Sequence, residues 1–128
     1  MSNLNKDLYV KNRYLENKDG VIWALTKQLY TLKRKAILNN IAFDISMPWV
    51  RNQFLAQEGL CSATGIPFSF EKYSPYEPYI DIVDCGLGYT MDNCRVVVAI
   101  FGRAKSCWSD KDVLNMSTLY LKHHKASI

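Results

Sequence analysis

The segment PYIDIVDCGLGYTMDNCRVV, at residues 78–97, begins with a short apolar run that carries two carboxylates. Asp81 and Asp84 could hold a divalent cation or exchange protons with a substrate, two roles that carboxylates take in many active sites. Acidic residues are disfavoured in β-strands, so their presence here asks for a chemical reason. Residues an odd number apart in a strand point to opposite faces, so a shared two-carboxylate site requires a bulge or a strand that ends at Val83.

The same segment predicts a β-hairpin that would position these carboxylates. Its first strand is short and apolar, and its loop CGLGYTMDN holds two glycines and an Asp-Asn pair that suit positive backbone angles. The second strand is expected to run on through residues 96–100. A short helix is expected over residues 103–106.

Helical patterns on both sides of the hairpin predict an α+β fold. Residues 1–20 form a polar N-terminal arm, and residues 21–128 form one domain. Apolar residues recur at spacings of three and four in 21–39, which predicts a helix, and Ser46 offers the N-cap of a second one. The final helix, which Ser109 caps, presents its apolar residues at helical spacing: Val113, Met116 and Tyr120.

Composition sets ordinary limits on the function. The chain has 128 residues, of which 48% are hydrophobic and 22% charged, as is typical of a globular domain. It has no apolar run long enough to span a membrane, and its first residues lack the apolar core of a signal peptide, so a cytoplasmic location is expected. A net charge of +4 permits a polyanionic partner without requiring one.

The cysteines do not have the spacing of a zinc site. They never approach a C-x-x-C pair, in which one turn presents two thiolates to the metal. Without a secretory signal, reduced and mostly buried thiols are expected. The cysteines are Cys61, Cys85, Cys94 and Cys107.

Basic residues gather on one face of the helix predicted over 21–39. Lys27, Arg34 and Lys35 share this face with Thr31, away from the apolar stripe. The face is either a solvated surface or a ridge that meets phosphates, because clustered lysine and arginine side chains release counterions from nucleic acid. The sequence leaves both interpretations open.

Four short sequence motifs follow one another along the chain: CSATGIPF at 61–68, PYIDIVD at 78–84, GYTMDNCRVV at 88–97 and GRAKSCWS at 102–109. In this order they resemble the HNH endonucleases, a branch of the His-Me finger or ββα-metal nucleases, and especially the small phage and bacterial members. Several motifs that match in the same order are more specific than a single motif. The similarity extends over roughly residues 23–121. It implies an HNH-type β-hairpin and helix core with N-terminal and C-terminal helices.

The resemblance also implies a metal site. In such enzymes the hairpin and the helix behind it hold one divalent cation, Mg²⁺ or Mn²⁺, which neutralises charge on the scissile phosphate. Asp81 matches the metal ligand on the first strand. Arg103 and Lys105 match basic residues of the helix that approach phosphate.

Other matched residues are expected to serve the fold. Gly88 permits the turn, and Asn93 matches the residue that braces the loop by hydrogen bonds. Trp108 is expected to pack beneath the hairpin.

Two positions depart from the family pattern. Ile82 stands where the family places His or Arg after the ligand aspartate, and it can neither accept a proton nor contact phosphate electrostatically. Gly102 stands where the family's helix supplies a second metal ligand, and it has no side chain. The expected catalytic centre therefore lacks its general base and one ligand.

These departures favour a degenerate nuclease of phage or mobile-element type that acts by binding. Its partner would be DNA or a protein of nucleic-acid metabolism or host defence, with the Tyr-rich loop at 73–79 as the candidate protein contact. The rival hypothesis is an active metal-dependent endonuclease or nickase that uses Asp81 with Asp84 or with a residue of the loop. The sequence leaves the oligomeric state open. The basic residues predicted to contact nucleic acid are Lys27, Arg34, Lys35, Arg51, Arg95, Arg103 and Lys105.

Overall fold

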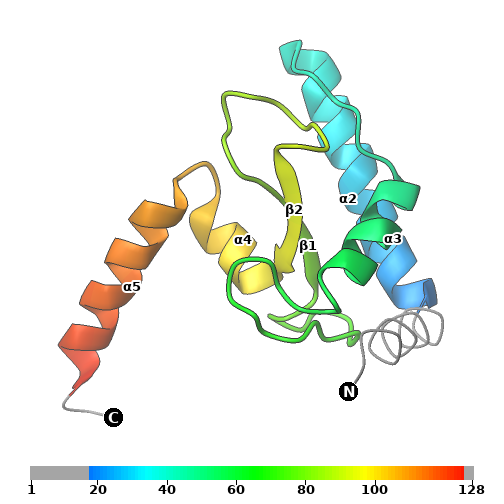
Figure 1. The fold of residues 1–128 in the computed structure, drawn as a ribbon. Coiled ribbons are helices and arrows are strands. Elements are labelled where there is room, and N and C mark those ends of the chain that lie inside the picture. The colour runs from blue at the N-terminus through cyan, green and yellow to red at the C-terminus, as the bar shows by residue number, and fades with distance from the viewer. Residues whose placement is uncertain (1–17, 126–128) are drawn as a thin grey trace.

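A computed structural model describes residues 18–125, so most of the N-terminal arm predicted over 1–20 lies outside the described residues. The described chain confirms a small α+β fold, in which a two-stranded hairpin lies between α4 on one side and α2 and α3 on the other (Figure 1). The elements in chain order are α2 (Lys18–Asn39), α3 (Met47–Ala56), β1 (Pro78–Ile82), β2 (Cys94–Val98), α4 (Ala99–Lys105) and α5 (Asp110–His124).

The two strands pair antiparallel, and the two faces of the hairpin pack against different helices. Ile80 lies opposite Val96, and both belong to the apolar core shared with α2 and α3. Asp81 lies opposite Arg95 on the other face, which α4 covers. Side chains alternate between faces along a strand, so one hairpin supports an apolar core and a charged cluster at once.

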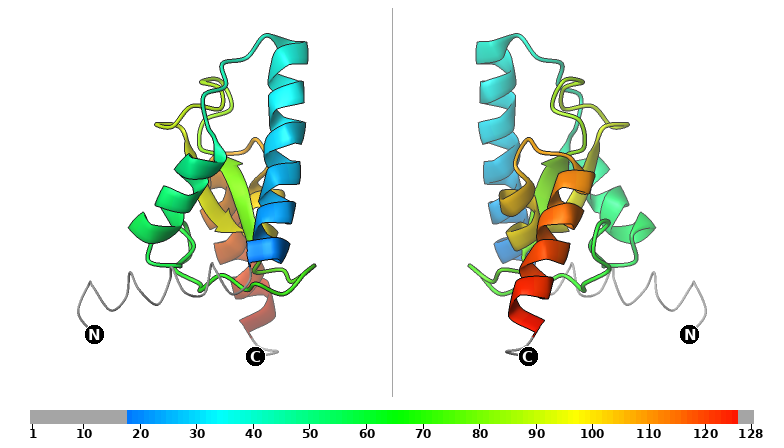
Figure 2. Two further views of the ribbon diagram at one scale, coloured as in Figure 1. Left: turned by 90° about the vertical axis from the view of Figure 1, so that its right-hand side faces the viewer. Right: turned by 90° about the vertical axis from the view of Figure 1, so that its left-hand side faces the viewer.

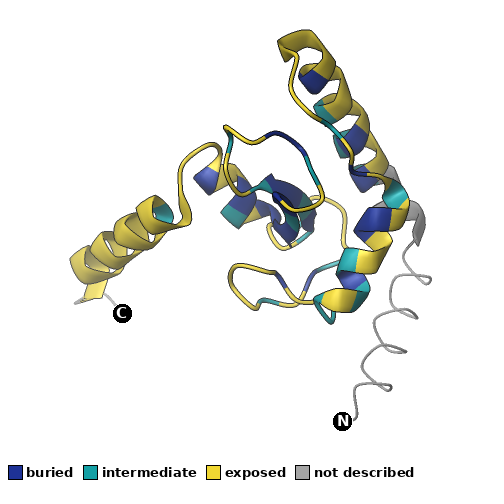
Figure 3. Ribbon diagram, turned by 45° about the horizontal axis from the view of Figure 1, so that its top comes forward, coloured by how far each residue is buried: buried dark blue, intermediate teal, exposed yellow. Residues whose placement is uncertain are grey.

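Apolar residues of α2, α3 and the hairpin meet in one core, which appears as the dark blue segments in Figure 3. Leu25 and Leu29 come from α2, and Val50 and Phe54 come from α3. Each pair is four residues apart, which places both members on one helical face. The apolar spacing therefore predicted α2 and the cap at Ser46 predicted α3, although α2 begins at Lys18 rather than at residue 21.

Two glutamine side chains close the open edges of the sheet. Gln28 of α2 donates from Nε2 to the carbonyl oxygen of Pro78 (3.1 Å) and accepts at Oε1 from the N–H of Ile80 (2.9 Å). Gln57, which caps α3, donates to the carbonyl oxygen of Val96 (2.8 Å) and accepts from its N–H (3.3 Å). Each amide satisfies one donor and one acceptor of an edge strand, so these backbone groups are not buried without partners.

The helix α4 starts earlier than the sequence predicted. The predicted helix covered residues 103–106, whereas α4 spans Ala99–Lys105 and follows β2 without a loop. The N–H groups of Ala99 and Ile100, at its first turn, donate to the carbonyl oxygens of Glu77 and Pro75. Carbonyls from the loop before β1 thus replace the side-chain cap that the helix lacks.

The helix α5 extends away from the rest of the domain (Figures 1 and 2). The predicted cap is confirmed as a full capping box, in which Ser109 Oγ accepts from the N–H of Asp112 and the Asp112 carboxylate accepts from the N–H of Ser109. Trp108 is 67% exposed, so the prediction that it packs beneath the hairpin is wrong. Ser106 takes a positive φ of 47° after α4, and the chain turns outward there.

The part of the chain that the structure describes contains no helix that is both long enough and apolar enough to cross a membrane. The segment IAFDIS, at residues 41–46, forms a single bridge from Phe43 to Tyr89 and no regular strand. Gly88 lies beside this segment with a φ of +84°, and a Cβ there would lie 3.0 Å from the carbonyl oxygen of Ala42. Glycine is therefore required at this turn, as predicted.

The edge contacts of Gln57 predict the effect of a near-isosteric change. In Gln57→Glu the side chain can no longer donate to the carbonyl oxygen of Val96 and presents a negative charge to it. We expect the free energy of unfolding to fall by about 1–3 kcal/mol, measured from the midpoint of urea denaturation at an unchanged slope. Asn52→Asp makes the same chemical change at an exposed position of α3 and should cost less than about 0.5 kcal/mol. Equal losses in both variants would contradict this role.

Candidate functional site

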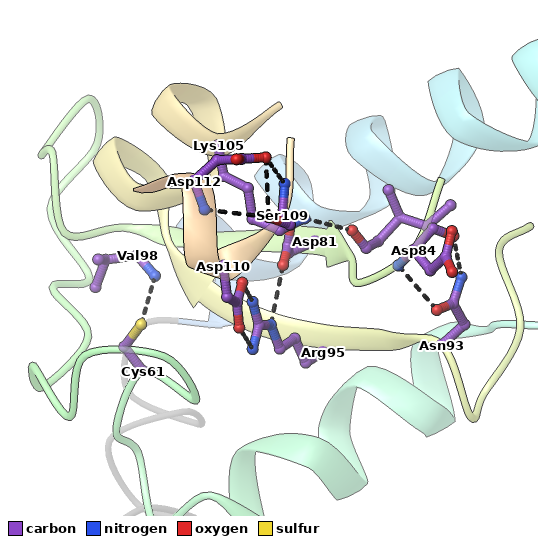
Figure 4. A network of polar contacts seen from close by, with 11 residues as sticks. Cys61, Asp81, Asp84, Asn93, Arg95, Val98, Lys105, Ser109, Asp110 and Asp112 are labelled. Atoms are coloured by element: carbon purple, nitrogen blue, oxygen red, sulfur yellow. Dashed lines mark hydrogen bonds and ion pairs between the residues drawn. The ribbon is translucent and has the colours of Figure 1, made fainter. Parts of the chain in front are cut away.

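Asp81 is buried on the face of β1 that α4 covers, with 2% of its surface exposed. Both of its carboxylate oxygens are bound by cations of the same chain. Oδ1 accepts from Lys105 Nζ at 3.3 Å, and Oδ2 accepts from Arg95 Nε at 2.9 Å (Figure 4). A buried carboxylate needs such partners, because the transfer of an ion from water to the interior without an opposite charge costs on the order of several kcal/mol.

Lys105 is the last residue of α4 and is fully buried. Its ammonium group donates to the carbonyl oxygen of Ile82 at 2.7 Å as well as to Asp81. The prediction that Lys105 approaches phosphate is therefore wrong. Its long side chain runs inward from α4 and brings a positive charge to the carboxylate.

Arg95 connects the buried carboxylate to the surface. Beyond its bond to Asp81, it donates from Nη1 and Nη2 to the two oxygens of Asp110 at 3.0 and 2.6 Å. Burial acts to lower the pKa of the Arg95 guanidinium, but the hydrogen bonds to Asp110 and Asp81 outweigh it and raise that pKa. The bond from Arg95 in turn lowers the pKa of Asp110. Arg95 is committed to two carboxylates of its own chain, which contradicts its predicted role at a nucleic-acid surface.

Tyr79 occupies the space beside Gly102. A Cβ built on Gly102 would overlap the ring atoms of Tyr79, which lies on the same face of β1 as Asp81. No larger side chain fits at this position unless the tyrosine moves. The helix position at which a second metal ligand would stand is therefore closed by packing as well as lacking a side chain.

Asp84 does not join Asp81. The strand β1 ends at Ile82, and Asp84 lies in the following loop, where its Oδ1 accepts from the N–H of Gly86 at 2.9 Å. Asn93 braces this loop as expected. Its Oδ1 accepts from the N–H of Asp84 (3.0 Å), and its Nδ2 donates to the carbonyl oxygens of Asp84 (2.7 Å) and Gly88 (2.8 Å).

The residues present do not fit a divalent cation at Asp81. Both carboxylate oxygens already have cationic partners, and Gly102 offers no ligand. Within residues 18–125, no group of three or more His, Cys, Asp and Glu side chains is arranged to hold a metal ion. A cation at Asp81 would have to displace a lysine ammonium group that is fully buried.

The cysteines have free thiols and occupy different environments. Cys61 and Cys94 are buried, Cys85 is half-buried and Cys107 is exposed, so the expectation of mostly buried thiols holds for only part of the set. Burial, with smaller contributions from the Asp81 and Asp44 carboxylates, raises the pKa of Cys94 to about 12. This thiol is therefore neutral at ordinary pH and behaves as a small apolar side chain.

A groove of about 400 Å³ lies along β1, and residues of α2, of the loop that precedes the strand and of α4 line it. Three basic residues line it: Lys27 from α2, Lys72 from the loop and Arg103 from α4. Tyr73 and Tyr79 add aromatic surface, and the Lys72 Nζ lies 5.2 Å from the centroid of the Tyr73 ring. The other lining residues are Ala24, Gln28, Thr31, Leu32, Glu77 and Ile80.

The structure separates the basic residues that were predicted to bind nucleic acid. Lys27 and Arg103, which are 76 positions apart in the numbering, meet in the groove. Arg34 and Lys35 are exposed farther along α2. Arg51 is exposed on α3 and does not line the groove.

Sequence reasoning missed two residues of this region. Lys72 stands alone in an irregular loop and gives no periodic signal, so its place beside α2 was not foreseen. Asp110 completes the charged cluster from the first turn of α5, where an acidic residue is common near any helix N-terminus. Neither position carries a local signal that would have distinguished it.

Comparison of the chain with protein-family models, with curated proteins and with solved structures finds no match. The function is therefore inferred from the residues and their geometry alone.

The cluster predicts an order of stability losses. Asp81→Asn leaves the Lys105 ammonium group buried without a counter-charge, so we expect the free energy of unfolding to fall by roughly 3–5 kcal/mol. Lys105→Met should cost less, because Asp81 keeps its bond to Arg95 and methionine fills a similar volume. Urea denaturation of both variants measures the order.

Asp92→Asn is the control for the loss of one carboxylate, because Asp92 is exposed. Its free energy of unfolding should change by less than about 0.5 kcal/mol. If Lys105→Met proved more damaging than Asp81→Asn, the central role of the carboxylate would be refuted.

Proposed function

We propose that this protein binds the phosphate backbone of nucleic acid, most simply DNA, without cleaving it. In this proposal the hairpin and α4 form an HNH-type platform whose metal centre has been replaced by internal ion pairs. The observation that carries the proposal is the state of Asp81, whose two oxygens are bound by Lys105 and Arg95. A carboxylate that is buried and neutralised in this way has no oxygen available for a catalytic cation.

The absence of the usual chemical groups supports the same conclusion. Ile82 has no group that accepts a proton from water, and Gly102 has none that binds a metal. General acid–base help alone contributes about 10²- to 10⁴-fold to catalysis, so a centre without it would be a very slow nuclease. Binding is the function that the remaining residues support.

The groove supports a polyanion as the ligand. Lys27, Lys72 and Arg103 bring three positive charges to one concave surface, against one negative charge from Glu77. Arg34 and Lys35 continue the basic face of α2 beyond it, since spacings of seven and eight residues from Lys27 fall on the same side of a helix. Such an arrangement attracts phosphates through counterion release.

Tyr73 adds an exposed aromatic ring to the basic groove. It is 80% exposed at the rim of the groove, and Tyr76 in the same loop is 44% exposed. An exposed ring beside a basic groove can stack on an unpaired base. The same exposure favours a second candidate, in which this loop contacts a protein of nucleic-acid metabolism or host defence.

The proposal includes two expectations that follow only from the resemblance. A phage or mobile-element origin would fit a nuclease-like protein that has kept its platform and lost its chemistry. The site of action would then be the cytoplasm, that of the host cell if the protein is phage-encoded.

Salt dependence tests the binding proposal. Fluorescence anisotropy with a labelled DNA oligonucleotide should show an affinity that falls steeply as salt rises, because each phosphate contact releases a counterion. Arg103→Ala should weaken binding roughly two- to tenfold and reduce the salt slope by about one. Lys27→Ala should do the same.

Arg51→Ala removes one exposed positive charge outside the groove and serves as the matched control. It should change the affinity by less than about twofold. No retention of DNA even at low salt would overturn the proposal and favour the protein-binding candidate. Equal losses in all three variants would show that the groove is not the binding site.

Cleavage assays test the loss of catalysis. We expect supercoiled plasmid to remain intact with Mg²⁺, Mn²⁺ or Ni²⁺ at enzyme concentrations that exceed those of the plasmid. Metal-dependent nicking that disappears in Asp81→Asn, in a sample whose folding is verified by circular dichroism, would show that Asp81 binds a catalytic cation. That outcome would replace the present proposal with an active nuclease.

A further inference from the structure

The helix α5 has no buried residue along its 15 positions. Several of its apolar side chains are largely exposed, among them Leu114 (67%), Tyr120 (65%) and Leu121 (57%). Figure 3 shows the helix almost entirely in the colour of exposed residues, and Figure 1 shows it standing apart from the rest of the domain. Within residues 18–125, the rest of the chain leaves this apolar surface uncovered.

Four apolar residues of α5 lie on one face; Val113 is half-buried and the other three are exposed, while Met116 lies at the edge of this face. Val113 and Tyr120 are seven residues apart, as are Leu114 and Leu121, and the two pairs stand next to each other on the helix surface. Ser117 lies at the centre of the face, where its small side chain lets another helix approach closely. Leu119 is the exception, because it falls on the opposite side of the helix.

A helix of this length needs a partner. Isolated helices of about 12–15 residues are marginal in water, and most helical stability comes from packing of an apolar face. The capping box at Ser109 and the pair Arg95–Asp110 hold the first turn only. The later turns, about three in number, have no contact of this kind with the domain, so their apolar face is available to a second molecule.

The order of residues in α5 is self-complementary about Ser117. Reading outward from Ser117 in both directions, Leu114 matches Tyr120 and Val113 matches Leu121. A two-fold interface requires this property, because residue i meets residue j and residue j meets residue i. Two antiparallel copies of α5 would thus place apolar residues against apolar residues on both sides of the axis.

The charges at the two ends of α5 select the antiparallel arrangement. The first turn holds Asp110 and Asp112 with one lysine, and the last turn holds Lys122, His123 and His124. Antiparallel pairing brings Asp110 close to His124 of a second copy, because both lie on the face of Ser117, whereas Asp112 and Lys122 point toward the opposite side of the helix. Parallel pairing would place like charges together at each end, which costs free energy.

We propose that two copies of this chain associate through α5, with the helices antiparallel and the two-fold axis at Ser117. The occupant of the exposed face is therefore α5 of a second identical molecule. One pair of helices of about 22 Å length makes a small interface, so the dimer is expected to form at micromolar concentrations rather than to be permanent. This inference does not depend on the proposed binding of nucleic acid.

Sedimentation velocity of the full chain tests the dimer. The wild-type protein should sediment with the mass of two chains at about 100 µM and dissociate on dilution below about 1 µM. Leu121→Lys places a charge in the proposed interface and should shift the protein to the monomer at 100 µM. Because Leu121 is exposed within one chain, this variant should keep the circular dichroism and the urea midpoint of the dilute wild type.

Leu119→Lys is the matched control, since Leu119 is equally exposed on α5 but faces away from the proposed interface. It should remain a dimer. A wild-type protein that is monomeric at 100 µM overturns the proposal. So does loss of association in both variants, which would mean unspecific contact between apolar surfaces.

Cross-linking tests the position of the axis. In a Cys107→Ser background, Ser117→Cys places two thiols at the axis, and oxidised glutathione should convert them into one disulfide between the chains while it is itself reduced to two thiols. Asn115→Cys, on the opposite side of α5, should not cross-link. Cross-linking of Asn115→Cys but not of Ser117→Cys would refute the antiparallel arrangement.

Discussion

A carboxylate buried beside a two-stranded sheet must be neutralised from within the domain, and this requirement determines how the C-terminal half of the protein is assembled. Asp81 on β1 binds Arg95 on β2 and Lys105 at the end of α4. Arg95 then holds Asp110 and with it the start of α5. One buried charge thus connects β1 with β2, α4 and the start of α5, and its loss would leave the Lys105 ammonium group without a counter-charge.

The basic residues divide into an internal and an external group. Asp81 and Asp110 carry two negative charges, and Arg95 and Lys105 carry two positive ones, so this cluster is neutral as a whole. The net charge of +4 therefore arises elsewhere in the chain. Arg95 and Lys105 are bound to carboxylates within this cluster and are unavailable to a phosphate. The groove at Lys27 is lined by other basic residues.

Local signals predicted the parts of the fold that depend on neighbours within one or two turns. The caps at Ser46 and Ser109 and the apolar stripes of α2 and α3 are of this kind. The direction of α5 was not predictable, because it depends on one positive φ at Ser106 and on the ion pair between Asp110 and Arg95 of β2. The inward course of Lys105 was missed for a similar reason. The orientation of α4 on the sheet decides whether Lys105 is exposed to solvent or bound to Asp81. This orientation cannot be read from the spacing of residues in the sequence.

The glutamine amides at the sheet edges have a consequence for aggregation and for recognition. A peptide that joins a protein as an added strand needs unpaired N–H and C=O groups on an edge, and exposed edges of this kind also template fibrils. Gln28 and Gln57 hold those groups on the two outer sides of the hairpin. The hairpin cannot recruit a third strand unless α2 or the end of α3 first moves away. Partners of this protein are therefore expected to meet side chains of helices and loops rather than the backbone of the hairpin.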